Sequence, residues 1–288
     1  MKMIIVGDIA TGDKFASIDF PILPNQLFLA NLEGPILSQN YSYFAIPKVG
    51  PSLYSSFIPE NISNYKFSFS LANNHMMDYG KPGLDTTITI LTQKGIYYCG
   101  AANNVSSARQ PLIIQHRGIS IGIISCCEAQ FGVARNNQPG VAEFGPWIYK
   151  AIKNLTQIVD IIIVSVHAGV EDSPWPSPFI RDLYRSYIDA GATIIHGHHA
   201  HVPQGYEEYN DGLIFYGLGN FAVDPEKWKN YPNGLWSIGA DINLNTKPLQ
   251  WVLKTFEIRH KSGSQKFSIE ESNSEEHEEH IKYIDLCN

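Results

Sequence analysis

Four of the ten histidines in this chain lie within six residues, where an apolar run ends. The stretch GATIIHGHHAHV, residues 191–202, carries them as His196, His198, His199 and His201. Neutral imidazoles are common protein ligands of divalent transition metals. The spacing therefore indicates a metal site, and other parts of the chain must supply the remaining ligands.

Polar side chains also follow other apolar runs of the chain. Asp8 follows MIIVG and Glu33 follows LFLANL. Asn74 follows FSLAN, and His167 ends DIIIVSVH. Because ligands of open α/β sheets bind at the carboxyl ends of strands, we expect these side chains to meet the histidine run. Burying them unpaired would be unfavourable, whereas a metal ion accepts their lone pairs.

The predicted ligand set mixes carboxylate, amide and imidazole groups and contains no cysteine. It consists of Asp8, Glu33, Asn74, His167, His199 and His201. Such oxygen and nitrogen ligands suit Mn, Zn or Fe, with Ca or Mg as further options. We expect one or two divalent ions, and two ions would share a bridging carboxylate.

The histidine run leaves one alternative open. His198 is the rival of His199, because adjacent residues leave a strand end in opposite directions. His196 lies within the predicted strand, and we expect it to be a hydrogen-bonded core histidine.

Alternating strand and helix patterns must position these side chains. Runs rich in Ile, Val and Phe predict buried strands at 1–8, 27–34, 65–74, 118–128, 160–169, 192–199 and 212–221. Helical patterns occupy residues 83–95, 146–160 and 177–191. From about Gly234 the pattern is β-rich, with strands at 234–244 and 249–260. This order predicts an α/β fold with helices on the sheet faces, in a single domain over residues 1–288.

Composition restricts the partners. With 44% hydrophobic residues the chain is expected to fold, and a net charge of −7 argues against nucleic-acid binding. No run approaches the roughly 20 apolar residues of a membrane span, and the start MKMIIVGDIA is too short for a secretory signal. We therefore expect a cytoplasmic protein. Residues 262–288 are predicted to be an acidic C-terminal tail.

The order of these motifs resembles a known family. GD, NLEG, LANNHMMDYG, GAANN, VHAGVE, GHHAHV and YGLGNF follow one another between Asp8 and about Phe221. This order is similar to that of the bacterial CapA-type capsule-biosynthesis proteins, also called poly-γ-glutamate synthesis proteins. They are a branch of the calcineurin-like metallophosphoesterases. The resemblance implies a four-layer α/β/β/α sandwich with a metal site at one end.

The resemblance also implies roles for single residues. Asp8 takes the place of the first-strand aspartate, and Glu33 matches the bridging carboxylate. Asn74 is the implied amide ligand, and its neighbour His75 would help to protonate a leaving group. The remaining metal positions match His167, His199 and His201. One departure is Ala10, which stands where the wider superfamily has a metal histidine, so the first metal position is one protein ligand short.

Further residues are candidates for supporting roles. We expect Asp78 to fix its loop or to orient His75, and Glu171 to steady a metal histidine or to act as a base. Asn220 is expected to brace the site by hydrogen bonding. The cations considered for an anionic substrate are Lys48 and Arg135. Substrate selection is expected to lie in the loops 39–51 and 130–146.

Three functions fit these residues. The preferred one is a metal-dependent hydrolase of a phosphoester or of a peptide or poly-glutamyl substrate, linked to capsule or envelope polymer synthesis. The second is a non-hydrolytic peptide epimerase, because a cation beside an amide carbonyl acidifies the neighbouring Cα–H. The third is a non-catalytic accessory protein that binds metal or polymer. The expected partners are thus a small molecule, a peptide or an anionic polymer.

Overall fold

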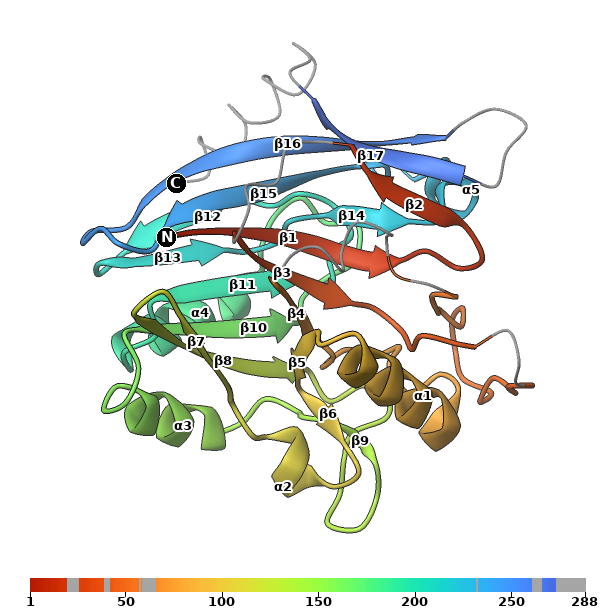
Figure 1. The fold of residues 1–288 in the computed structure, drawn as a ribbon, viewed down its shortest axis with the longest axis horizontal. Coiled ribbons are helices and arrows are strands. Elements are labelled where there is room, and N and C mark those ends of the chain that lie inside the picture. The colour runs from red at the N-terminus through yellow and green to blue at the C-terminus, as the bar shows by residue number, and fades with distance from the viewer. Residues whose placement is uncertain are drawn as a thin grey trace.

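The computed structural model describes residues 1–19, 26–38, 42–56, 58, 66–231, 233–260 and 266–272. Within them, most strands belong to two large sheets, and the longer helices pack against the outer faces of these sheets (Figure 1). The carboxyl ends of the parallel strands of both sheets carry the polar residues that the sequence singles out.

The larger sheet is built around β1 (Lys2–Ala10), which is buried from Met3 onward. In the described residues its strand order is β2 (Phe15–Ile18), β17 (Lys266–Ser272), β16 (Gln250–His260), β15 (Trp236–Asn243), β1, β3 (Leu27–Leu32), β4 (Lys66–Ser70) and β5 (Tyr97–Cys99). A further strand, β14 (Asn220–Val223), also pairs with β1. Since β1, β3, β4 and β5 are parallel, their carboxyl ends lie at one edge.

The smaller sheet has the order β12 (Tyr206–Tyr209), β13 (Gly212–Phe215), β11 (Ile194–His198), β10 (Ile161–His167), β8 (Ile119–Cys127) and β7 (Leu112–His116). Its four central strands, β13, β11, β10 and β8, are parallel. The register pairs His167 with His198, so β10 and β11 end side by side. A small separate ladder joins β6 (Ala101–Ala102) to β9 (Gly140–Val141).

In the described residues, three large apolar cores and one small one around Ala108 hold the sheets and helices together. The helices are α1 (Gly80–Gln93), α2 (Val105–Ala108), α3 (Trp147–Leu155), α4 (Pro178–Asp189) and α5 (Pro225–Trp228). One core, which includes Ile5 and Ile163, lies between the two sheets. A second packs α1 against the outer face of the larger sheet, and a third packs α3 and α4 against the smaller sheet. The mixed α/β class is therefore confirmed, and the complete four-layer sandwich stays a prediction.

The prediction of one strand over residues 212–221 is wrong. These residues form β13 in the smaller sheet and β14 in the larger one. Residues 216–219 form a crossing in which the chain passes from one sheet to the other. Gly219 has a φ of +77°, a left-handed conformation that favours glycine. A Cβ on Gly7 would lie 1.8 Å from the Gly219 carbonyl oxygen, so only a glycine in β1 permits this close approach. The crossing brings Asn220 beside Asp8 in the β1–β14 pairing.

Part of the predicted acidic tail is a strand. β17, at Lys266–Ser272, pairs with β16 on one side and with β2 on the other. Residues 262–265 and 273–288 of the predicted tail lie outside the described residues.

Candidate metal centre

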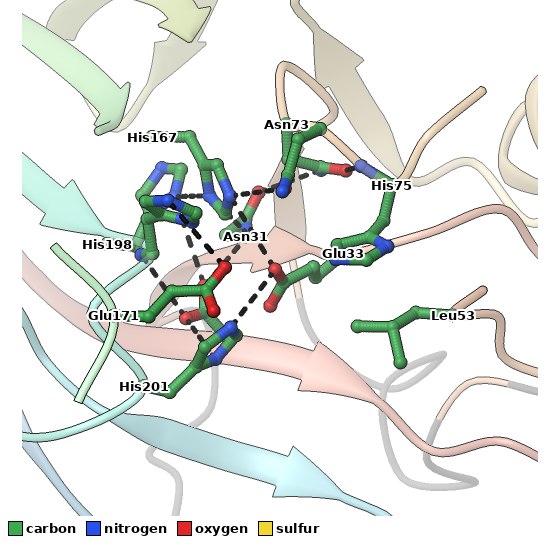
Figure 2. Close-up of polar contacts among 12 residues, drawn as sticks. Asn31, Glu33, Leu53, Asn73, His75, His167, Glu171, His198 and His201 are labelled. Atoms are coloured by element: carbon green, nitrogen blue, oxygen red, sulfur yellow. Dashed lines mark hydrogen bonds and ion pairs between the residues drawn. The ribbon is translucent and has the colours of Figure 1, made fainter. Parts of the chain in front are cut away.

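All six predicted ligands lie at or just beyond the carboxyl ends of strands from both sheets. Figure 2 labels three of them, Glu33, His167 and His201. Asp8 is in β1, Glu33 directly follows β3, and Asn74 lies beyond β4. His167 ends β10, and the pair from the histidine run follows β11. The potential donor atoms of the five carboxylate and histidine ligands form overlapping groups, in each of which all atoms lie within 4.8 Å of one another. Two of these groups share Glu33: Asp8–Glu33–His201 and Glu33–His167–His199.

Glu33 lies at the centre of the cluster. Its side chain is fully buried, and neither carboxylate oxygen accepts a hydrogen bond within the described part of the chain. Oε1 lies 3.5 Å from Nε2 of His167 and 3.5 Å from Nε2 of His201. Burial, reinforced by the negative charge of Asp8, raises the pKa of Glu33 well above its ordinary value. A buried carboxylate between two imidazoles and without hydrogen-bond donors fits a cation site.

Asp8 is held by an amide that the sequence prediction missed. Asn31 in β3 donates from Nδ2 to Asp8 Oδ1 at 2.8 Å. Asn73 donates to Asn31 Oδ1 at 3.1 Å and to the Leu32 carbonyl at 2.8 Å, which sets the orientation of the Asn31 amide. Burial raises the pKa of Asp8 to about 7. Asn31 lies in the motif NLEG and Asn73 in the motif LANN, but their contact partners follow only from the strand register.

His201 is oriented by Asn220, as expected. Asn220 donates from Nδ2 to the Gly234 carbonyl at 3.0 Å, so its Oδ1 is an acceptor that faces Nδ1 of His201 at 3.0 Å. His201 therefore carries its proton on Nδ1 and presents an unprotonated Nε2 to Glu33. Burial lowers the pKa of His201 to about 3, which keeps the ring neutral. His201 and His199 have φ values of +60° and +99°, conformations that are uncommon for residues other than glycine.

We expect Asn220→Ala to weaken metal binding about 10–100-fold, because His201 loses the acceptor that fixes its Nδ1 proton. Calorimetric titration of the metal-free protein with Zn²⁺ measures the change. Asn104→Ala is a matched control, since it removes another hydrogen-bonded amide, the N-cap of α2. Equal affinities for the wild type and the Asn220 variant would contradict the assigned role.

His167 and His199 form the second donor group with Glu33. His167 Nε2 lies 2.9 Å from Asn74 Oδ1. His199 Nδ1 is buried and has no hydrogen-bond partner among the described residues. Burial lowers the pKa of His199 to about 4 and that of His167 well below its ordinary value. Both rings can thus offer a lone pair at neutral pH.

His198 competes less well for a ligand role. Although it forms a donor group with Asp8 and His167, both of its ring nitrogens already have partners. Nδ1 lies 2.7 Å from Nδ1 of His167, and Nε2 lies 3.0 Å from Ser165 Oγ. This arrangement favours His199 as the ligand. His196 is hydrogen-bonded in the core, as expected.

His75 and Asp78 form a pair beside the cluster. Nδ1 of His75 lies 2.7 Å from Asp78 Oδ2, which also accepts the Leu53 amide at 2.8 Å. Asp78 therefore contacts both the His75 ring and the loop around Leu53, and its part in catalysis stays a prediction. Lys48 Nζ lies 2.5 Å from Asp78 Oδ1, and only 9% of its side chain is exposed. The expectation that Lys48 holds an anionic substrate is therefore not supported, because its charge is already paired.

Glu171 marks the solvent side of the cluster. Its carboxylate lies 4.0 Å from His199 Nε2, and its side chain is 56% exposed. Arg135, the other cation considered for a substrate, instead pairs with Glu143 at 3.2 Å. The aromatic ring of Trp228, which the sequence did not single out, lies 4.4 Å from the ring of His201.

Two facing sheets with a carboxylate and histidine cluster at their strand ends are the arrangement expected of a metallophosphoesterase-like α/β protein. The chain belongs to the family described as bacterial capsule synthesis protein PGA_cap, whose model matches residues 13–225. The family resemblance of the sequence motifs is therefore confirmed.

Curated relatives carry related names. The capsule biosynthesis protein CapA of Bacillus anthracis is 31% identical over 248 residues, which cover 78% of this chain and 60% of the relative. The PGA biosynthesis protein CapA of Bacillus subtilis is 36% identical over 157 residues, 53% of this chain and 41% of the relative. The chain thus spans about half the length of the curated relatives it matches.

A solved structure supports the fold alone. A hypothetical protein from Thermus thermophilus matches with a TM-score of 0.50 and 12% identity, over 89% of this chain and 99% of that one. None of the helices in the described residues has the length and apolar character that crossing a membrane requires.

Proposed function

We propose that this chain is a metal-dependent hydrolase that acts in the synthesis of an anionic capsule-type polymer. The bond it cleaves would be a phosphoester or a peptide-type bond of a poly-glutamyl substrate. The observation that carries the proposal is Glu33, a buried carboxylate between His167 and His201 that accepts no hydrogen bond within the described residues. The names of the curated relatives support the link to capsule and PGA synthesis.

The donors fit two adjacent divalent ions. One position would use Asp8, Glu33 and His201, and the other would use Glu33, Asn74, His167 and His199. Lowered pKa values keep the imidazoles unprotonated, which is the state that binds a metal. Divalent ions at such a site supply Lewis-acid polarisation and activate water at neutral pH. Ala10 leaves the first position with three protein ligands, so its ion is expected to bind more weakly.

The chain's own residues would handle the leaving group. Nδ1 of His75 lies 2.7 Å from Asp78 Oδ2 and 2.9 Å from Nζ of Lys48. When the His75 ring is protonated, its Nδ1–H donates to Asp78, and its Nε2–H would donate to the leaving group. Lys48 compensates the charge of Asp78, and Asp78 in turn binds the Leu53 amide. This network holds the His75 ring in one orientation, which a general acid requires.

Two measurements test the proposal. Elemental analysis of the purified protein is expected to give up to two equivalents of divalent metal, falling to one or none in His201→Ala. The metal-loaded protein is expected to turn over a member of a panel of phosphomonoesters, phosphodiesters and γ-glutamyl peptides. Metal binding without turnover on any of these would favour a binding-only accessory role instead.

We expect His75→Gln to slow turnover about 100-fold or more on substrates with a poor leaving group. Nitrophenyl substrates should lose far less, because their leaving group departs without a proton. The metal content should stay unchanged. Steady-state kinetics on paired alkyl and nitrophenyl substrates measures this contrast, with His116→Gln in β7 as the control. A loss that is equal on both substrates would argue against an acid role.

Peptide epimerisation is a second candidate. The exposed carboxylate of Glu171 beside His199 is the feature that favours it, since a base open to solvent can remove and return a Cα proton. The measurement is incubation of a glutamyl peptide in D₂O. Deuterium incorporation at Cα without cleavage would select the epimerase, and cleavage without incorporation would select the hydrolase.

A further inference from the structure

A chain of hydrogen-bonding groups runs through the interior from β1 to His167. The Val6 carbonyl oxygen lies 2.8 Å from Nε2 of His196, and Nδ1 of His196 lies 2.9 Å from Ser165 Oγ. Ser165 Oγ lies 3.0 Å from Nε2 of His198, whose Nδ1 lies 2.7 Å from Nδ1 of His167. The chain therefore connects a backbone group in one sheet with a predicted metal ligand in the other.

The register of β10 and β11 creates this chain. Ser165 pairs with His196, and His167 pairs with His198. Since side chains alternate along a strand, Ser165 and His167 point to the same face, as do His196 and His198. All four side chains are buried, with at most 1% exposure. Water therefore cannot replace any of these contacts without a rearrangement of the core.

The direction of proton donation along this series of hydrogen bonds follows from its first acceptor, the Val6 carbonyl oxygen. A carbonyl oxygen only accepts, so His196 donates from Nε2 to Val6 and leaves Nδ1 as an acceptor. Ser165 must then donate its hydroxyl proton to His196, and its oxygen accepts from Nε2–H of His198. His198 is left with an unprotonated Nδ1.

If this direction continues to the last contact, His167 Nδ1 carries a proton and donates it to His198 Nδ1. A neutral imidazole with Nδ1–H has its lone pair on Nε2, and Nε2 of His167 faces Asn74 and Glu33.

We propose that Val6, His196, Ser165 and His198 form a tautomer relay that holds His167 with Nδ1 protonated and Nε2 open to a cation. The inference rests on the metal site of the proposed function, but the tautomer is a property of the metal-free protein. Ser165, His196 and His198 are thus positioning residues that act through His167.

A competing arrangement makes the inference testable. Asn31 Nδ2 lies 3.3 Å from His167 Nδ1, against 2.7 Å for His198. If Asn31 donated to Nδ1, His167 would carry its proton on Nε2 and donate it to Asn74 Oδ1. That tautomer would close Nε2 to a metal.

The decisive measurement is a long-range ¹H–¹⁵N correlation spectrum of metal-free protein labelled with ¹⁵N-histidine, assigned with His167→Ala. The relay predicts that His167 is the Nδ1–H tautomer in the wild type and loses this preference in Ser165→Ala. Titration with Zn²⁺ should show affinity about 10–100-fold weaker in Ser165→Ala. The control is Ser125→Ala. Ser125 is a buried serine of the neighbouring strand β8, and the strand register places it beside Ser165. This control should retain both the tautomer and the affinity.

Two results would overturn the relay. One is a wild-type His167 protonated on Nε2, and this result needs no variant to fold. The other is a Ser165→Ala protein with unchanged tautomer and unchanged Zn²⁺ affinity. Failure of the wild type to bind any metal would contradict the proposed function, and the metal-free spectrum would still decide the relay.

Discussion

Glu33→Gln is expected to remove metal binding and at the same time to stabilise the metal-free protein. The wild-type carboxylate is fully buried and accepts no hydrogen bond in the described part of the chain, so its charge is costly without a cation. A neutral amide of the same shape avoids most of that cost. We expect the free energy of unfolding of the metal-free protein at pH 8 to rise by about 1–3 kcal/mol. Zn²⁺ affinity should fall about 100-fold or more, since one carboxylate serves both donor groups.

The opposite signs of these two effects separate a metal ligand from a structural residue. Denaturant unfolding of chelator-treated protein measures the stability, and calorimetric titration measures the affinity. Glu207→Gln is the matched control, because Glu207 forms an ion pair with Arg185 at 2.6 Å, which lowers its pKa. That variant should lose stability and keep its metal affinity. A Glu33→Gln protein that is less stable without metal, or that binds metal normally, would refute the assignment.

Removal of the metal is expected to lower the melting temperature more at pH 8 than at pH 5.5. In the metal-free protein burial raises the pKa of Asp8 from 3.8 to about 7, so the folded state holds a proton that the unfolded state releases. Stability of the metal-free protein therefore falls as the pH rises from about 4 through 7. A bound cation takes the place of this proton on Asp8, and the same argument holds for Glu33, whose pKa is also raised.

The buried histidines lower the stability of the folded protein at acidic pH. His199 and His201 have pKa values of about 4 and about 3 in the folded protein, against 6.5 in the unfolded chain. The unfolded state therefore takes up protons first, and stability falls as the pH drops below about 6.5. Protons on the carboxylates and imidazoles also compete with the cation, which weakens metal binding at low pH.

Thermal unfolding with and without Zn²⁺ at pH 5.5, 7 and 8 measures both effects. When the free metal concentration is 1,000 times the Kd measured at the same pH, bound metal should raise the free energy of unfolding by about 4 kcal/mol. The gain in melting temperature should increase with pH. Asn104→Ala, outside the cluster, should show the same profile as the wild type. A gain that is equal at pH 5.5 and pH 8 would contradict the pKa directions given for the two carboxylates.

The gathering of these side chains was predictable from the sequence because each polar residue ends or follows an apolar run. Parallel strands bring such ends to one edge, so type and spacing sufficed to place Asp8, Glu33 and His167 together, and their role as ligands stays a proposal. Their hydrogen-bond partners were not predictable in the same way. Asn31 contacts Asp8, and Ser165 contacts His196, only through registers between segments that are distant in the chain.

Other parts of the fold gave weaker signals. The short strands β2 and β5 have three or four residues each, too few for a clear alternation of apolar and polar side chains. β17 lies in a stretch predicted to be an acidic tail, and its burial depends on β16 and β2 on either side. The break in 212–221 depends on the close approach of Gly7 and Gly219, which no local pattern reports.

The crossing from β13 to β14 ties the two sheets together beside the cluster. Asn220 begins β14 and belongs to the larger sheet, whereas its partner His201 follows β11 of the smaller one. A sliding movement of one layer over the other would therefore stretch this hydrogen bond. The position of Nε2 of His201 therefore depends on how the two sheets are aligned, and a distant change that shifts one sheet would also shift this atom.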